Sequence, residues 1–530
     1  MVDYGSNLYL LPFHLKKDVD LSKQFPTHFF SMSQELGITV SKDQNPSEWY
    51  TQVVKKAGLA KYADVKGCMI IKPYGMKLWE SIKENFNTKI ESTGVENAYF
   101  PLFITEKQLE REEDIVDGFD PEVGWVTHGG DKELERKIAV RPTSESVIAP
   151  YMADEIRSHR DLPFRVNQWS NVVRWEATDT RPFLRTREFL WQEGHTAHET
   201  EEGADEETML RLEQYQEVIE NHLAIPSILG YKPEHDKFPG AKYTTTIETL
   251  MPDGKSIQSG TSHQLGQHFA EAFDITFEDE NSDEQTAWTT SWGLSTRTIG
   301  ALIMAHGDDD GLRLPPSVAP TQVVVVPIYQ EDNREEVMKY AEDVKHQIAH
   351  SGGCGCQENI RVKLDDRDHR TPGYKFNEWE LKGVPLRVEV GPNEMEEDTV
   401  TTVRRDTGDK EMGVDRKIFL RNIKDNLVDI QESMYAELKE YKQENIREAE
   451  SKNKILATIG KNRGYVKTRW CGKESCEEEV KEEVSAEIVV LPFQEDSEPA
   501  TIQDDKNQID GKCAVCGESA ERWAYFAKNY

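Results

Sequence analysis

The sequence lacks the features of a membrane or secreted protein. It contains no apolar run of about eighteen residues, the minimum length for a transmembrane helix. Pro12 and His14 interrupt the only apolar stretch near the N-terminus, so no secretory signal is predicted. Cysteine is also scarce, with 7 residues in 530, which argues against a disulfide scaffold and leaves metal binding or free thiols. These absences predict a soluble cytoplasmic protein.

Positive charge is scarce as well. Lys and Arg number 64 against 97 Asp and Glu, which gives a net charge of −33. A protein that coats nucleic acid without specificity depends on excess Lys and Arg, so that class is excluded. Eleven Trp and eighteen Tyr exclude a disordered acidic chain. A surface this acidic stays hydrated in concentrated salt, which favours a salty cytoplasm; an acidic protein of an ordinary cytoplasm is the alternative.

A length of 530 residues predicts two to four domains. A Gly-, Asp- and Pro-rich segment at 307–320 has the composition of a linker. Strands and helices that alternate beyond it predict a small sheet covered by helices. The expected elements before the linker are a helix at 76–90, a strand at 98–104, strands at 164–176 and 184–193, and a helix containing Leu212, Tyr215, Ile219 and Leu223. Those after it are strands at 323–326, 360–364, 386–390 and 399–405, and helices at 334–348, 374–381 and 417–450.

The pair of strands at 164–176 and 184–193 carries an unusual set of polar residues. Arg174 and Glu176 would project from the same face of the first strand, and Arg185 and Phe189 lie on the second. Paired cations, a carboxylate and an aromatic ring can together bind a polyphosphate, a metal and a flat base. A ladder of ion pairs between the strands is the alternative.

A second arginine stands at the start of an apolar segment. Arg297 precedes Thr298–Ala305, and a guanidinium that enters such a segment needs an anionic partner. That partner is either a ligand or a structural carboxylate.

Together these spacings resemble a known family. Arg-x-Glu at 174–176, Arg-x-x-x-Phe at 185–189 and Gly-x-x-x-Arg at 293–297 resemble motifs 2 and 3 of class II aminoacyl-tRNA synthetases. Tyr99-Phe100-Pro101 resembles motif 1, the dimer-forming element. Longer strings look like those of prolyl-tRNA synthetases of the archaeal and eukaryotic type, and the resemblance runs from Trp49 to Tyr530. These strings are Arg141–Glu145, Trp169–Asn171, Phe183–His195 and Gly260–His263.

The resemblance implies an α+β multidomain fold. Its parts are an N-terminal extension at 1–46, a class II catalytic domain at 47–310 with an antiparallel sheet and flanking helices, an α/β anticodon-binding domain at 311–420, and a small zinc-bearing domain at 421–530. The implied activity is that of a homodimeric ligase, which activates L-proline with ATP and Mg²⁺ and transfers prolyl to tRNA(Pro). Only about sixty residues separate His195 from Gln258, too few for an inserted editing domain, so selection would rest on contacts in the pocket. Cysteine is the expected intruder, because its volume is close to that of proline. Another class II synthetase and an inactive RNA-binding relative are the alternatives.

The resemblance also implies the proline-binding residues. Thr143 and Glu145 would hold the secondary ammonium of proline, and His263 would line the pocket. Arg174 would bridge the proline carboxylate and the α-phosphate of ATP. From the residues alone, Thr143 could equally cap a helix and His263 could be a core histidine.

For ATP, the resemblance implies that Phe189 stacks on adenine and Arg297 clamps the γ-phosphate. Gln258 would lie near the magnesium ion. The full ATP-binding set is Arg174, Glu176, Arg185, Thr186, Phe189, Gln258, Thr261, Ser295 and Arg297.

Four cysteines near the C-terminus have the spacing of a zinc site. Cys471-x4-Cys476 and Cys513-x2-Cys516 form two pairs, and Zn²⁺ accepts four thiolate ligands in a tetrahedron. The sequence therefore predicts a structural zinc ion; reduced free thiols are the alternative.

Residues 1–31 differ from the rest of the chain. Their three Lys and three Asp cancel, and six aromatic residues occur among them. This pattern favours a misassigned start, with the native chain beginning at Met32 or Ser33; an appended arm that docks on the core or on a partner is the alternative.

Overall fold

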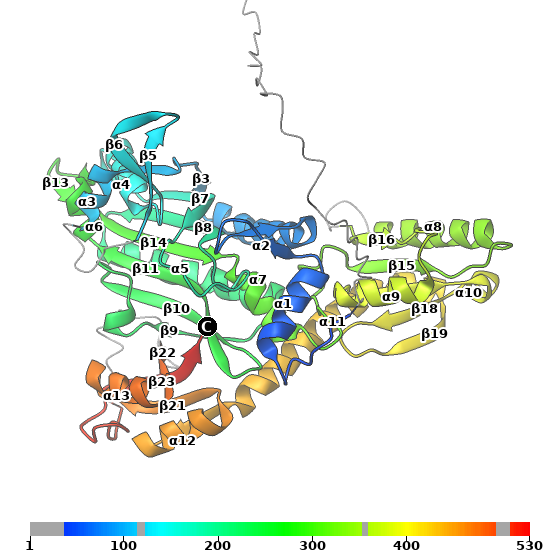
Figure 1. Ribbon diagram of the computed structural model, residues 1–530. Helices are drawn as coiled ribbons and strands as arrows, with labels where there is room; N and C mark the ends of the chain where they lie inside the picture. Colours follow the sequence, from blue (N-terminus) through cyan, green and yellow to red (C-terminus); the bar gives the residue numbers. More distant parts are fainter. Residues whose placement is uncertain (1–36, 114–121, 352–358, 494–508) are drawn as a thin grey trace, which may run out of the picture. The chain divides into compact units, whose positions relative to one another are not determined.

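The computed structural model describes residues 37–113, 122–351, 359–493 and 509–530. The expectation for residues 1–31 falls outside them. The largest element is an eleven-stranded sheet with the order β20-β21-β23-β22-β9-β10-β11-β14-β8-β7-β3 (Figure 1). Its strands are β3 (Glu96–Asn97), β7 (Phe164–Val173), β8 (Glu188–His198), β9 (Ser227–Tyr231), β10 (Tyr243–Leu250), β11 (Lys255–Gly266), β14 (Trp288–Ser295), β20 (Ile446–Ala449), β21 (Tyr465–Trp470), β22 (Glu487–Pro492) and β23 (Arg522–Asn529).

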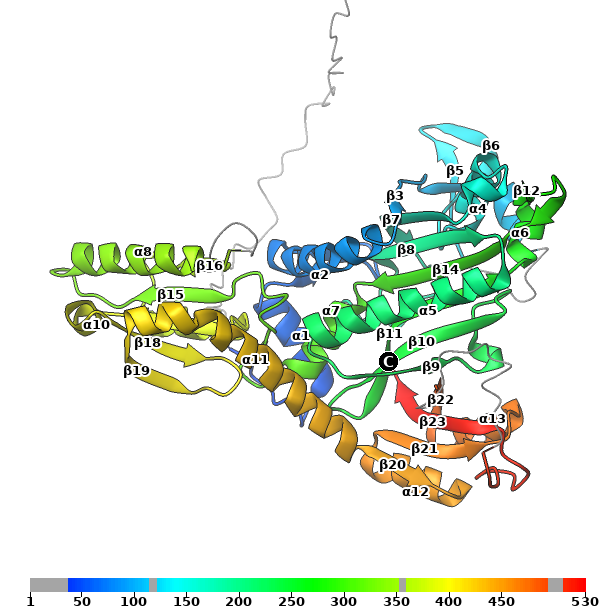
Figure 2. The same cartoon turned by 180° about the vertical axis from the view of Figure 1, so that it is seen from behind.

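The middle of this sheet is antiparallel, as expected. Each neighbour from β9 through β10, β11, β14 and β8 to β7 runs antiparallel to the next, and β3 is added in parallel at the edge. Helix α5 (Glu201–Glu217) lies across one face, against β8, β10, β11 and β14 (Figure 2). Helix α2 (Pro73–Glu91) packs beside α5, where Phe86 stacks on Tyr215 at 4.7 Å. The helix predicted at 76–90 is therefore confirmed.

The side chains of β8 explain why one face of the sheet packs against α5 while the other face carries polar residues. These side chains alternate, and Gln192 faces α5, where its amide oxygen accepts a hydrogen bond from the Tyr215 hydroxyl at 2.6 Å. Gly194 is required on that face because a Cβ there would lie 2.1 Å from the indole of Trp292. The intervening residues of β8 point to the opposite face.

Three predicted strands are wrong in extent. Residues 98–104 do not form one strand: β3 ends at Asn97, and β4 (Phe103–Thr105) belongs to a separate sheet with β6 (Lys132–Val140) and β5 (Gly124–Gly129). Pro101 between them has no N–H to donate to a ladder. The hairpin strands also differ from prediction, because β7 ends early at Val173, and β8 begins late at Glu188 and continues to His198. Residues 174–187 form an irregular loop instead, and the Arg174 N–H donates to the Arg187 carbonyl at 2.8 Å across its base.

A five-stranded sheet follows, with the order β16-β15-β17-β18-β19. The predicted alternation is confirmed, since parallel strands β15, β16 and β17 are separated in sequence by helices. The segment 307–320 is not an exposed linker, because Leu312, Leu314 and Val318 are fully buried. The elements here are β15 (Val323–Pro327), α8 (Arg334–His350), β16 (Val362–Leu364), α9 (Pro372–Leu381), β17 (Leu386–Val390), α10 (Pro392–Glu397), β18 (Thr399–Arg404), β19 (Lys410–Asp415) and α11 (Arg416–Glu444).

The C-terminal strands continue the large sheet instead of forming a separate one. Strand β22 pairs with β9, and β23 pairs in parallel with the start of β11. The buried Lys232 ammonium donates to the Val489 carbonyl at 3.1 Å, and the hydroxyls of Ser256 and Tyr465 lie 2.9 Å apart. Helices α12 (Lys452–Asn462) and α13 (Glu474–Val484) cover these strands.

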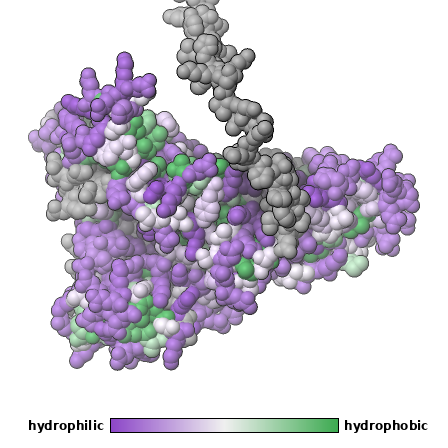
Figure 3. Space-filling view, in the orientation of Figure 1, coloured by the Kyte–Doolittle hydropathy of each residue, from purple (hydrophilic) through white to green (hydrophobic). Residues whose placement is uncertain are grey.

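The face seen in Figure 3 is dominated by hydrophilic residues, as the excess of Asp and Glu requires. Among the described residues, no helix is both long enough and apolar enough to cross a membrane.

Candidate active site

A cavity of about 150 Å³ opens on the face of the large sheet opposite α5. Its floor is formed by alternate residues of β8, namely Phe189, Trp191, Glu193 and His195, and by parts of β11 and β14. Thr143 and Glu145, at the start of α4 (Glu145–Glu155), form one side, and Arg174 from the loop after β7 forms another.

The α4 side of the cavity is a network of nearly buried polar groups. The Thr143 hydroxyl donates to the Glu145 carboxylate, and the Ser144 hydroxyl donates to Glu193 Oε1. Gln168 Nε2 donates to Ser144 Oγ at 2.8 Å, and this hydrogen bond holds the Ser144 side chain in place before α4. The residue that precedes the helix as N-cap is Ser144, not Thr143, which removes the capping alternative for Thr143.

Several polar atoms of the cavity wall have no hydrogen-bond partner among the described residues. Glu193 Oε2 and His195 Nε2 lie 3.6 Å apart, and both side chains are about 95% buried or more. Ser291 Oγ and Trp191 Nε1 are likewise unpartnered. Buried polar atoms are rarely left unsatisfied, so this wall suits a small polar ligand that supplies the missing bonds.

His263 stands on β11 with its ring 4.9 Å from that of Phe238. Its Nδ1 lies 2.9 Å from the Thr244 hydroxyl. Burial, together with the nearby His195 and Arg174, lowers the pKa of His263 to about 3. The ring is therefore neutral and forms part of an apolar wall with Phe238.

A second cavity adjoins the first and shares Arg174, Phe189, Ser295 and Arg297 with it. The loop 174–187 supplies most of its remaining wall. Arg174 and Glu176 both line it, although they lie beyond the end of β7 and not on a strand face as the sequence suggested. The Arg174 guanidinium lies 5.5 Å from the centre of the Phe189 ring.

Three arginines converge on this second cavity. Arg297, the first residue of α7 (Arg297–His306), donates through Nε to the Leu184 carbonyl at 3.1 Å. Burial and the nearby charges of Arg174 and Arg185 lower the pKa of Arg297 to about 10, against the opposing effect of Glu248. Among the described residues, no carboxylate oxygen lies within 4.0 Å of these three guanidinium groups. The arrangement favours a polyanionic ligand and argues against the predicted alternatives of an ion-pair ladder and a structural carboxylate.

All twelve residues predicted for proline and ATP line one or both cavities. Trp191, Glu193, His195, Phe238 and Ser291 also line the first cavity but were absent from the predicted site. For three of them a signal is present in the sequence, because Phe189, Trp191 and Glu193 alternate along the predicted strand at 184–193 and His195 continues the same alternation beyond it.

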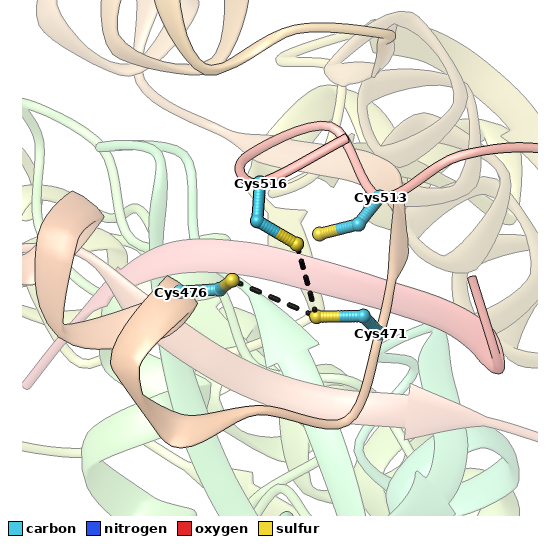
Figure 4. Close-up of side chains that lie close together, drawn as sticks. All are labelled: Cys471, Cys476, Cys513 and Cys516. Carbon is cyan, nitrogen blue, oxygen red and sulfur yellow. Dashed lines mark hydrogen bonds between the residues drawn. The ribbon is translucent and has the colours of Figure 1, made fainter. Parts of the chain in front are cut away.

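The four C-terminal cysteines come together, as predicted (Figure 4). Their sulfurs lie within 4.8 Å of one another, and Cys471 Sγ is 3.6 Å from Cys476 Sγ and 3.5 Å from Cys516 Sγ. Four sulfurs held at about 2.3 Å from a zinc ion would stand about 3.8 Å apart, so these residues fit the metal. Burial raises the pKa of Cys471 to about 11, so the group would be protonated without a metal.

Known proteins resemble the chain along nearly its whole length. Residues 125–306 match the tRNA synthetase class II core domain (G, H, P, S and T), 322–426 an anticodon binding domain, and 453–530 a prolyl-tRNA synthetase C-terminal domain.

Two curated relatives carry the same name. A proline–tRNA ligase of Haloarcula marismortui is 57% identical over 94% of this chain and 100% of its own length, and one of Natranaerobius thermophilus is 48% identical over 92% and 97%. The solved structure of prolyl-tRNA synthetase from Cryptosporidium parvum complexed with L-proline and AMP superposes with a TM-score of 0.85 and 40% identity, covering 94% of this chain and 97% of that one. The chain therefore belongs to the proline–tRNA ligase family of class II aminoacyl-tRNA synthetases.

Proposed function

We propose that the first cavity binds L-proline and the second binds ATP, so that prolyl-adenylate forms where they meet at Arg174. The observation that carries this assignment is the pairing of opposite charges across the junction. Glu145 supplies a nearly buried carboxylate at one end, and three arginines without carboxylate partners stand at the other. A zwitterion and a polyphosphate fit this gradient.

In the proline pocket, Glu145 holds the secondary ammonium by charge and hydrogen bonding, and Thr143 contributes its hydroxyl oxygen. The neutral His263 ring and Phe238 enclose the apolar ring of the substrate. Glu193 and His195 extend this set, because their unpartnered atoms face the same space.

In the ATP pocket, Phe189 offers its ring to adenine, and Arg185 and Arg297 bind the phosphates. Glu176, Thr186, Thr261 and Ser295 complete the wall with polar groups. Arg297 is held by the Leu184 carbonyl and by the start of α7, so its guanidinium is already oriented before the ligand arrives.

The reaction proceeds by two displacements. A proline carboxylate oxygen attacks the α-phosphorus, the bond to the bridging oxygen breaks, and pyrophosphate leaves. A hydroxyl of the terminal ribose of tRNA(Pro) then attacks the acyl carbon, and AMP leaves. Arg174 touches both groups that react in the first step and stabilises the charge that develops between them.

Mg²⁺ suits the oxygen donors at this site. Gln258 lines the first cavity with an amide oxygen, and an ion held by one protein oxygen keeps its remaining positions for water and phosphate. The ion would neutralise phosphate charge. The Cys471, Cys476, Cys513 and Cys516 cluster would hold a structural Zn²⁺.

We also propose a homodimer that works in the cytoplasm, where tRNA and ATP are found. The segment that resembles motif 1 carries exposed aromatic side chains, with Tyr99 77% and Phe103 47% exposed, which a second copy would cover. The domain limits at 46, 310 and 420 remain part of this proposal, as does activation of cysteine as an error.

Glu145→Gln tests the proline pocket. Losing one charged contact of about 2–3 kcal/mol is expected to raise KM for proline about 30- to 150-fold in ATP–pyrophosphate exchange. KM for ATP should change less than about threefold. Glu155→Gln removes the same charge from the exposed end of α4 and serves as the matched control. Equal changes in both KM values would contradict the assignment.

A further inference from the structure

Four cations from four separate parts of the chain gather near the loop that borders the ATP cavity. Lys255 begins β11, and Lys528 lies directly opposite it in the parallel pairing of β11 with β23. Lys255 Nζ lies 4.5 Å from the centre of the Tyr530 ring, and the Arg181 guanidinium lies 5.8 Å from the same ring. We call the set the basic cluster: Arg181, Lys255, Arg463 and Lys528.

Arg463 reaches the cluster from the end of helix α12. Its Nη1 donates to the Asp253 carbonyl at 3.4 Å, and the neighbouring Gly464 N–H donates to the Gly254 carbonyl at 2.9 Å. Burial lowers the pKa of Lys255, and the charges of Arg181, Arg463 and Lys528 act in the same direction against Asp253. Arg181, Arg463 and Lys528 are therefore each close enough to Lys255 to repel its charge.

The basic cluster carries more positive charge than the one acid acting on Lys255 can offset. Among the described residues, none of its side chains forms an ion pair within 4.0 Å, although thirty-three more acidic than basic residues are present in the chain. Asp253 is the acid whose charge raises the pKa of Lys255, against the opposing charges of Arg181, Arg463 and Lys528. Its carboxylate also accepts a hydrogen bond from the Tyr530 hydroxyl and one from the Lys255 backbone N–H at 3.2 Å. Like charges held together without partners are costly unless an anion binds them.

The loop that carries Arg181 also forms part of the wall of the ATP cavity. Arg181 and Arg185 exchange two backbone hydrogen bonds, of 2.7 and 2.9 Å, and Arg185 lines that cavity. A polyanion on the cluster would therefore lie at the edge of the site where the adenylate forms. The second reaction step needs one polyanion there, the 3′ end of tRNA.

We propose that the basic cluster binds phosphates of the single-stranded 3′ end of tRNA and guides its terminal ribose to the adenylate. This inference rests on the proposed function and adds to it residues of β11, β23 and the end of α12. The C-terminal part of the chain, which carries the cysteine cluster, would then also take part directly in the transfer of prolyl to tRNA. The ATP phosphates are held by the three cavity arginines instead.

Lys528→Gln and Arg463→Gln test the proposal separately. Each should lower tRNA affinity about three- to tenfold, and each should reduce the slope of log affinity against log salt by about 0.7, the value for one single-strand phosphate. ATP–pyrophosphate exchange, which needs no tRNA, should stay within about twofold of wild type. Lys454→Gln, an exposed lysine at the other end of α12, is the matched control and should change neither quantity.

A tRNA trimmed of its 3′ single-stranded nucleotides makes the test specific. If the cluster binds that end, trimming the tRNA weakens its binding to the wild-type protein. With trimmed tRNA, the variants should then bind almost as tightly as the wild type. Equal weakening on intact and trimmed tRNA would overturn the proposal, as would no weakening on either. Absent proline-dependent exchange in the wild type would instead refute the proposed function, so the two failures are distinguishable.

Discussion

Replacing Arg174 with alanine is expected to slow prolyl-adenylate formation about 10²- to 10⁴-fold. The guanidinium is proposed to contact both the carboxylate that attacks and the phosphate that is attacked, and each charged hydrogen bond contributes about 1.5–3 kcal/mol. The fold should be unaffected, because Arg174 is exposed and forms no ion pair with a carboxylate among the described residues, so its removal leaves no charge unpaired. Arg174→Lys keeps the charge but lacks the planar guanidinium, so its rate of adenylate formation should lie between those of the wild type and Arg174→Ala.

The assay is proline-dependent ATP–pyrophosphate exchange, with thermal unfolding of each variant measured alongside. Arg187→Ala is the matched control, because Arg187 stacks over Trp175 at 4.6 Å in the same loop without lining either cavity. It should retain activity within about threefold of wild type. An Arg174→Ala enzyme that works within about tenfold of wild type would refute the role given to this residue.

Three further outcomes follow from the structure. Burial lowers the pKa of His306 to about 4 from 6.5, so the protein should lose stability as the pH falls below 6.5. By pH 5 this group should lower the free energy of unfolding by about 2 kcal/mol in denaturant titrations. His306→Gln, which keeps a donor for the Leu223 carbonyl, should not show this loss. Cys513→Ser should remove the bound zinc, as metal analysis would measure, and should lower the unfolding temperature while leaving the exchange rate per folded molecule little changed. Cys68→Ser, outside the cluster, should have neither effect, and native protein without zinc would contradict this prediction. The slope of log affinity for tRNA against log salt concentration should be no steeper than about −3, as expected when the basic cluster binds four tRNA phosphates. A slope near −8 would reveal further phosphate contacts.

Local patterns predicted the parts of this molecule that depend on neighbouring residues. The strands and helices from Val323 to Arg404 follow periods of two and 3.6 residues, and they appear within a few residues of their expected limits. The site residues were found through short strings that resemble a family, and the structure brings all of them to two adjoining cavities.

Long-range pairing was not predictable in the same way. Nothing in residues 487–492 indicates that β22 would pair with β9, more than 250 residues earlier in the chain, and so join the C-terminal strands to the catalytic sheet. The composition of 307–320 suggested an exposed linker, but its apolar residues are buried against neighbouring elements. Arg174 and Glu176 were placed on a strand because alternation alone does not show where a hairpin opens into a loop.

The first cavity is proposed to select proline for activation by ATP. ATP–pyrophosphate exchange with the wild-type chain, run separately with each of the twenty amino acids, measures this selection. Proline should support the fastest exchange, and cysteine should be the next best substrate. Exchange with no amino acid, or faster exchange with an amino acid other than proline, would contradict it.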